Sequence, residues 1–323
     1  MNQEDFLSIR DFSPAEIERL IALAREIKAN PAAYTDKLRG KTLAMIFEKP
    51  SLRTRVTFDV GIHQLGGFSL YLSPAEISLG KRESVHDTAK NLERMVQGIM
   101  IRTFAHEIVE QMAKHAHIPV INGLTDYSHP CQAMADFLTI QEVKGKLKGL
   151  HVAYVGDGNN VAHSLMFAGA QLGAHVYVAT PKGNEPDATA LHWAKQRAQA
   201  TGGNCVVTND PREAVTRADV VYTDVWASMG QEAEAEKKKE KFRDYQVNAS
   251  LFGLANKDAI FMHCLPAHRG EEVSGDVIDS PHSVVFQQAE NRLHAQKAIM
   301  LELMKDVVVG AVDLAGKPEM AKA

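Results

Sequence analysis

The sequence predicts an α/β protein of two doubly wound domains, each with a central parallel sheet flanked by helices. Short apolar runs of strand length alternate with longer amphipathic stretches along the chain, which is typical of parallel strands joined by helical crossovers. The alternation stops once, at a polar, Gly-containing segment near residues 143–149, and then restarts. The length of 323 residues also fits two domains of ordinary size.

The first half opens with a helix signal at Ser13 and Glu16. These residues form a capping-box pattern with Pro14 at the first helical position, and the helix is expected to run to about Asn30. Four buried strands are expected at 43–47, 68–72, 98–102 and 118–121. Helices are expected between and after them, at 52–65, 85–96, 108–115 and 130–143.

The second half repeats the pattern. Five further strands are expected at 151–155, 174–179, 205–208, 220–224 and 260–263. A last helix, at about 290–309, is long enough to cross back onto the first half. The expected division is therefore 1–145, 146–289 and a C-terminal helical segment 290–323 that packs on the first domain, with crossing helices joining the two domains.

Composition excludes several classes of function. A net charge of −4 and a pI near 6.4 give no overall basic field, so we expect no nucleic-acid partner. No segment has the roughly 20 apolar residues of a membrane span, and the N-terminus lacks the pattern of a signal peptide. Three dispersed cysteines argue against a disulfide framework or a zinc cluster. We expect a cytoplasmic protein with a small-molecule partner.

The motif "SLRT", residues 51–54, stands where a strand gives way to a helix. A helix N-terminus offers free N–H groups and a favourable dipole to an anion. Arg53 adds a planar fork suited to phosphate oxygens and Thr54 adds a hydroxyl. The alternative is that Ser51 is only a helix cap and the arginines are solvated. Arg55 cannot share the face of Arg53 and is expected to pair structurally.

Two more motifs follow predicted strands, where parallel sheets bind ligands. "HPCQ" offers His129 and Gln132 to a carbonyl group, although a lone histidine is usually structural. "GDGNN" resembles a dinucleotide fingerprint, but the next strand lacks the acidic residue that would hold a ribose. Asn159 and Asn160 instead indicate recognition of a small polar molecule.

The last two motifs also lie at strand ends. In "DVWASMG", Asp224 can hold an ammonium group, and Ser228 and Met229 begin a loop before a charged run that is adequately explained as a solvated face. In "HCLP", Cys264 precedes a Pro-bounded turn, and on its own it reads as a small core residue.

Together, in this order, the five motifs resemble the aspartate/ornithine carbamoyltransferase family over nearly the whole chain, and "DVWASMG" and "HCLP" resemble its ornithine branch. The resemblance implies carbamoyl transfer from carbamoyl phosphate to the δ-amine of L-ornithine, giving L-citrulline and phosphate in arginine metabolism, with no cofactor or metal. Three alternatives remain open: another amine acceptor (putrescine or an N-acylated ornithine), an oxidoreductase, and a non-catalytic binding protein.

The resemblance also assigns residues. Those implied to contact carbamoyl phosphate are Ser51, Leu52 through its backbone, Arg53, Thr54, Arg102, His129, Gln132, Cys264, Leu265 and Arg292. Those implied to bind ornithine are Asn160, Asp224, Ser228 and Met229, and the catalytic residues are expected to be Arg102, His129, Asp224 and Cys264. Leu52 departs from the family's common Thr.

Three further expectations concern assembly and movement. The resemblance implies a homotrimer or an assembly of trimers. In relatives, a loop corresponding to residues 77–84 reaches a neighbouring subunit's site. The loop 228–240 is expected to close over ornithine, because Gly230 stands beside a charged segment.

Overall fold

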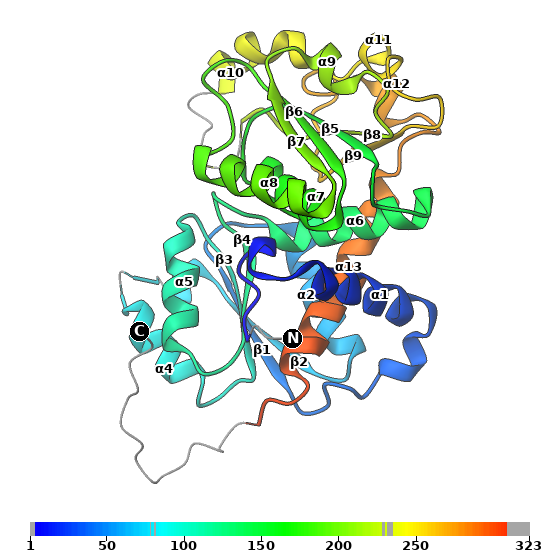
Figure 1. The fold of residues 1–323 in the computed structure, drawn as a ribbon. Coiled ribbons are helices and arrows are strands. Elements are labelled where there is room, and N and C mark those ends of the chain that lie inside the picture. The colour runs from blue at the N-terminus through cyan, green and yellow to red at the C-terminus, as the bar shows by residue number, and fades with distance from the viewer. Residues whose placement is uncertain (1–3, 78, 81, 228–229, 231–234, 309–323) are drawn as a thin grey trace.

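The computed structural model describes residues 4–77, 79–80, 82–227, 230 and 235–308, which form two α/β domains stacked one above the other in Figure 1. Both sheets are parallel, which confirms the predicted fold class. The first has the order β2-β1-β3-β4 and the second has the order β7-β6-β5-β8-β9. The strands are β1 (Thr42–Phe47), β2 (Phe68–Leu72), β3 (Gly98–Arg102), β4 (Val120–Leu124), β5 (His151–Val155), β6 (His175–Ala179), β7 (Asn204–Thr208), β8 (Val220–Thr223) and β9 (Ile260–His263).

Helices flank both sheets. Those of the first domain are α1 (Pro14–Ala29), α2 (Leu52–Gln64), α3 (Pro74–Ile77), α4 (Val85–Leu92), α5 (His106–His115) and α6 (Pro130–Lys144), with short 3-10 turns η1 (Ile9–Asp11) and η2 (Pro31–Tyr34). Those of the second are α7 (Asn160–Leu172), α8 (Ala188–Thr201), α9 (Pro211–Val215), α10 (Ala235–Phe242), α11 (Ala249–Phe252) and α12 (Gly275–Ile278), with the turn η4 (Arg243–Tyr245).

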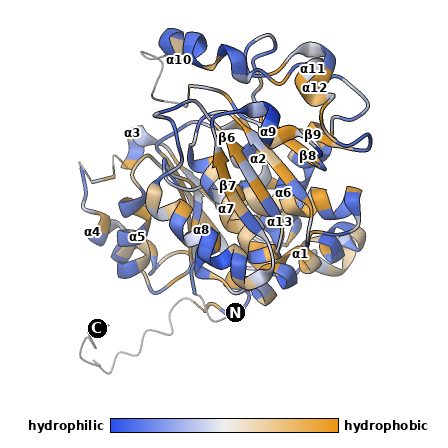
Figure 2. Cartoon of the chain, turned by 45° about the horizontal axis from the view of Figure 1, so that its top comes forward, coloured by the Kyte–Doolittle hydropathy of each residue, from blue (hydrophilic) through white to orange (hydrophobic). Residues whose placement is uncertain are grey.

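Local sequence signals explain where several helices begin. The capping box of α1 is confirmed, because Ser13 Oγ accepts from the Glu16 amide at 3.3 Å and Glu16 Oε2 accepts from the Ser13 amide at 2.9 Å. Figure 2 shows hydrophobic strands inside the second domain and a hydrophilic α10 at its surface. None of the helices in the described part of the chain is long and apolar enough to span a membrane.

The last helix, α13 (Val285–Met304), starts earlier than the expected residue 290. It packs against α6, α1 and α2, and in Figure 1 it runs from the second domain down into the first. The early start places Gln288 on the same helix as Arg292. Residues 309–323 lie outside the described chain, and residues 305–308 are not helical.

Among the other elements, β4 and α4 depart furthest from the expected ranges. The strand expected at 118–121 is β4, Val120–Leu124, and it begins only after Pro119, which has no N–H to give to a ladder. The helix expected at 85–96 ends at Leu92, where the Met95 and Val96 amides both turn back to the Leu92 carbonyl.

Candidate active site

The N-terminus of α2 forms a compact polar turn next to the end of β1. Ser51 caps the helix: its Oγ accepts from the Thr54 amide at 3.2 Å and lies 3.1 Å from Thr54 Oγ1. The side chain of Leu52 is 74% exposed, so only the backbone of this residue is available to the turn. Arg55 leaves the turn and stacks its guanidinium on the ring of Tyr71, 4.0 Å from the centroid, in keeping with a structural pairing.

Thr54 is fully buried, and its hydroxyl joins two distant arginines. Arg102, the last residue of β3, and Arg292, on α13, each donate to Thr54 Oγ1 at 3.4 Å. Arg102 and Arg292 are themselves almost entirely buried. Thr54 lies in the first turn of α2, Arg102 ends β3 and Arg292 lies on α13, so only the fold brings these three residues together.

The arginines concentrate positive charge in this buried place. Burial, followed by the charges of Arg292 and Arg53, lowers the pKa of Arg102 to about 9. Burial also lowers the pKa of Arg53, which is half-buried, while the nearby Cys264 and Asp224 oppose that shift. Three guanidinium groups that repel each other in a low-polarity site would gain strongly from an anion.

His129 lies at the N-terminus of α6, beside the same arginines. Burial lowers its pKa well below the usual value, and the charges of Arg292, Arg102 and Arg53 add to this effect. The imidazole is therefore neutral at neutral pH, and its Nδ1 has no hydrogen-bond partner within the described residues. The His129 amide donates to Ser164 Oγ on α7 at 2.8 Å, which ties this turn to the second domain.

Gln132 lies one turn further along α6 and faces α13. Its Oε1 accepts from Arg292 Nη1 at 2.7 Å, and its Nε2 donates to Asp136 Oδ1 at 2.8 Å. Both ends of the amide are thus engaged within the protein.

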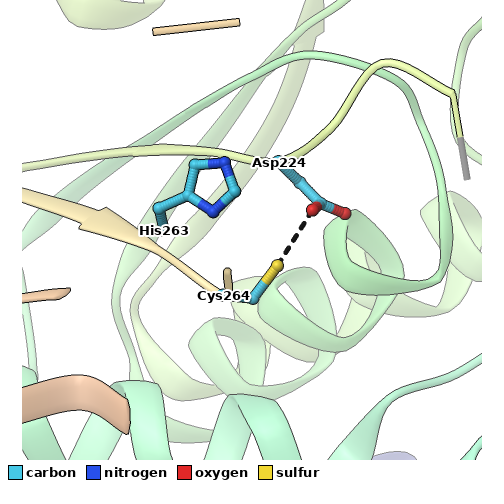
Figure 3. A group of neighbouring side chains, drawn as sticks. All are labelled: Asp224, His263 and Cys264. Atoms are coloured by element: carbon cyan, nitrogen blue, oxygen red, sulfur yellow. Dashed lines mark hydrogen bonds between the residues drawn. The ribbon is translucent and has the colours of Figure 1, made fainter. Parts of the chain in front are cut away.

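The second domain contributes Asp224 and Cys264, which follow the adjacent strands β8 and β9. Figure 3 shows the two side chains facing each other, and Cys264 Sγ donates to Asp224 Oδ1 at 2.9 Å. Burial, together with the Asp224 carboxylate, raises the pKa of the Cys264 thiol well above its usual value. Cys264 is therefore a neutral donor rather than a thiolate.

The two asparagines after β5 have different partners. Asn159 caps α7 through its Oδ1 and donates from Nδ2 to Asp224 Oδ2 at 2.8 Å. Asn160 instead donates to the carbonyl of Thr125 in the first domain. Ser228 and Met229 lie outside the described residues, as do residues 231–234. The expected loop 228–240 is shorter than predicted, because residues 235–240 belong to α10.

Leu265 follows Cys264 in a left-handed conformation, with φ of 57°. Its amide donates to His263 Nδ1 at 2.8 Å, and His263 Nε2 lies 3.1 Å from Glu272 Oε1. Candidate ligand atoms of Asp224, His263 and Cys264 lie within 4.8 Å of one another, as do those of His268, Glu271 and Glu272. A metal bound at the first group through one ring nitrogen of His263 would have to replace the hydrogen bond of that nitrogen.

Sequence reasoning missed two buried residues that hold this arrangement, Asp136 and Gln288. Gln288 Nε2 donates to Asp136 Oδ1 at 2.7 Å. The spacing of Gln132 and Asp136, four residues apart on a helix, is a signal that could have found one of them. Nothing local in the sequence relates Gln288 to either.

These features define a two-domain α/β protein in which a cluster of three arginines lies near Thr54 and close to the carboxylate–thiol pair of the second domain. Two family models match: "Aspartate/ornithine carbamoyltransferase, carbamoyl-P binding domain" over residues 4–142, and "Aspartate/ornithine carbamoyltransferase, Asp/Orn binding domain" over residues 148–303. The chain belongs to the aspartate/ornithine carbamoyltransferase family.

Similar proteins have consistent names. The chain is 57% identical to an ornithine carbamoyltransferase of Thermococcus kodakarensis over 94% of this chain and 98% of that one. It is 59% identical to an ornithine carbamoyltransferase of Anoxybacillus flavithermus, over 93% and 96%. The solved ornithine carbamoyltransferase of Pyrococcus furiosus superimposes with a TM-score of 0.91 at 55% identity, covering 94% of this chain and 98% of that chain.

Proposed function

We propose that this protein transfers the carbamoyl group of carbamoyl phosphate to the δ-amine of L-ornithine, giving L-citrulline and phosphate, in arginine metabolism. The convergence of Arg102 and Arg292 on Thr54, with Arg53 beside them, is the observation that carries the proposal. Such a cluster suits a phosphate dianion, and it lies next to the carboxylate–thiol pair of Asp224 and Cys264.

The phosphate would occupy the turn at the N-terminus of α2. Ser51, Arg53 and Thr54, with the backbone at Leu52, supply donors to its oxygens, and Arg102 and Arg292 neutralise its charge. The carbamoyl end would then lie near His129. The neutral imidazole of His129 is a proposed hydrogen-bond donor to the carbonyl oxygen, which becomes negative during the attack. Gln132 completes this end of the site by holding Arg292.

Ornithine would bind from the second domain. Asp224 suits an ammonium group, and Asn160, Ser228 and Met229 are the proposed contacts for the rest of the amino acid. An aliphatic amine has a reference pKa near 10.4, so the site must favour the neutral form that attacks the carbamoyl carbon. Cys264 and Leu265 stand where the two substrates would meet. The attack gives a tetrahedral intermediate, which expels phosphate without a covalent enzyme intermediate, and the proton lost by the attacking nitrogen leaves with the phosphate.

The test is carbamoyl transfer with ornithine, putrescine, acetylornithine and aspartate as separate acceptors, measured as phosphate release and as carbamoylated product. We expect turnover with ornithine alone, and its loss in an Arg53→Ala variant. Preference for another acceptor would overturn the proposed role of Asp224, and the absence of turnover with all four would overturn the enzymatic proposal.

We also propose a homotrimer or an assembly of trimers. Two packed elements of the first domain, α2 and the edge strand β2, expose large apolar side chains: Leu52, Val56, Val60, Phe68 and Leu70. The first three recur every fourth residue on one face of α2, and the other two alternate on one face of β2. We propose that a second copy of the chain covers these apolar side chains. The segment 77–84 supports the same partner, because the corresponding loop in relatives reaches the site of a neighbouring subunit.

Light scattering tests the assembly. Val60→Asp is expected to reduce the mass from a multiple of three chains to one chain, whereas a Glu18→Gln control on the exposed side of α1 is expected to leave it unchanged. A monomeric wild type would overturn the proposal. The three free cysteines agree with a reducing compartment, and we propose the cytoplasm.

A further inference from the structure

A buried carboxyl group outside the proposed substrate contacts lies between the two halves of the site. Asp136, on α6, has no exposed surface. Its Oδ1 accepts two hydrogen bonds, from Gln132 Nε2 at 2.8 Å and from Gln288 Nε2 at 2.7 Å. Burying a carboxyl group is unfavourable unless its partners compensate, so its presence in this core needs a reason beyond packing.

The first branch of contacts leads to the carbamoyl phosphate end. A glutamine amide has nearly the same shape in both of its orientations, so hydrogen bonds must select one. Because Asp136 accepts from Nε2 of Gln132, the Oε1 atom is the one that meets Arg292 Nη1, at 2.7 Å. The opposite orientation would place an NH₂ group against a guanidinium, two donors without an acceptor.

The second branch leads to the strands that carry the acceptor side. Gln288 Oε1 accepts from the His263 amide at 3.0 Å, and Gln288 Nε2 also reaches Tyr222 Oη at 3.1 Å. His263 immediately precedes Cys264, and Tyr222 lies on β8, which leads to Asp224. Through Gln288, the carboxyl group is therefore joined to the ends of β8 and β9.

We propose that Asp136 is a positioning residue for the reaction, which orients the Gln132 amide toward Arg292 and, through Gln288, fixes the end of β9 relative to the phosphate site. The proposal rests on the proposed carbamoyl transfer. The groups that act on the carboxyl are Gln132, Gln288, Arg292 and Tyr222, and each is part of the site or leads to it. Its Oδ2 has no hydrogen-bond partner in the described part of the chain.

The test is a double-mutant cycle with a conservative variant and a matched control. Asp136→Ala removes the acceptor for both glutamines, and Asp136→Asn keeps one oxygen that can accept from both. Gln132→Ala and the double variant complete the cycle. The control is Thr139→Val, on the same helix: its buried hydroxyl accepts from Asn291 Nδ2 at 2.8 Å across the same α6–α13 contact, without touching Gln132.

We expect Asp136→Ala to lower kcat/KM for carbamoyl phosphate at least tenfold, Asp136→Asn to stay within about threefold of wild type, and Thr139→Val to change little. The double variant is expected to lose clearly less than the sum of the two single losses, because Asp136 acts through Gln132 at the carbamoyl phosphate end and only its contact with Gln288 is independent of Gln132. Urea unfolding of each variant verifies that it is folded. If Asp136→Ala does not fold, Asp136→Asn keeps the proposal testable.

Additive losses in the cycle, an equal loss in Thr139→Val, or unchanged kinetics in folded Asp136→Ala would each overturn the positioning role. Calorimetric binding of carbamoyl phosphate, without an acceptor, separates this proposal from the proposed function. Absence of turnover in the wild type would refute the carbamoyl transfer, whereas wild-type turnover with unchanged binding and kinetics in Asp136→Ala would refute only the role of Asp136.

Discussion

Thr54→Val is the substitution that most directly tests how the proposed phosphate site is held together. Valine nearly preserves the volume of threonine but removes the hydroxyl that accepts from Arg102 Nη1 and Arg292 Nη2. A buried donor that loses its acceptor costs about 1–3 kcal/mol. Both distances are 3.4 Å, which is long for a hydrogen bond, so the lower end of about 1 kcal/mol applies to each donor. For the two donors together we expect a loss of about 2 kcal/mol in the free energy of unfolding.

The effect on turnover has a separate origin. A hydrogen bond from the Thr54 hydroxyl to a charged phosphate oxygen is worth about 1.5–3 kcal/mol. Since about 1.4 kcal/mol corresponds to a factor of ten, kcat/KM for carbamoyl phosphate should fall roughly 10- to 100-fold. Initial rates at saturating ornithine measure this, and urea unfolding measures the stability. Thr139→Val is the matched control, because Thr139 is an equally buried helical threonine away from the arginines.

A Thr54→Val variant whose kcat/KM stayed within twofold of wild type would refute the view that this hydroxyl organises the phosphate site. A similar fall in Thr139→Val would show that the loss reflects general destabilisation rather than the arginine contacts.

Three further predictions concern buried polar groups. Because burial raises the pKa of the Cys264 thiol, its alkylation by iodoacetamide, followed by mass spectrometry, should stay slow at neutral pH, and rapid labelling there would contradict a neutral donor. Burial raises the pKa of Asp136 from 3.8 to about 7, so the native state binds this proton more tightly and loses the associated stability as pH rises between those values. The free energy of unfolding of Asp136→Asn, measured in urea relative to wild type, should therefore rise by roughly 1.4 kcal/mol per pH unit over that range. A difference that does not change with pH would contradict the raised pKa. Lys238→Met breaks the buried ion pair with Asp157 and should lower the free energy of unfolding by about 3–5 kcal/mol. Adding Asp157→Asn to this variant should recover part of the loss. Equal stability of the wild type and Lys238→Met would show that the pair contributes little.

Local patterns in the sequence determined much of the fold. Alternating apolar runs and helical periodicity predicted strands and helices close to their observed ranges, because these patterns act over a few residues. The same holds for the turn at the N-terminus of α2, since a Ser cap after a buried strand specifies a helix N-terminus by itself. The predicted start of β4 was wrong, because Pro119 has no N–H to donate and the strand begins only after it.

The resemblance named the site residues, but their partners depended on tertiary structure. The motif indicated both Asn159 and Asn160, and the resemblance assigned only Asn160 to the ornithine site. In the structure, Asn159 is the residue whose amide donates to Asp224. Which neighbouring asparagine turns toward a strand end is decided by the helix cap, because Asn159 Oδ1 caps α7 and so directs its Nδ2 toward β8.

By itself, the sequence determined the class of fold, the turn at the N-terminus of α2 and the kinds of side chain at the strand ends. Only the tertiary structure decided that Arg102 and Arg292 meet at Thr54 and that Asp136 lies between the halves of the site. The physical reason is range: caps and periodicity depend on neighbours along the chain, whereas these contacts depend on the order of strands in each sheet and on where α13 crosses α6.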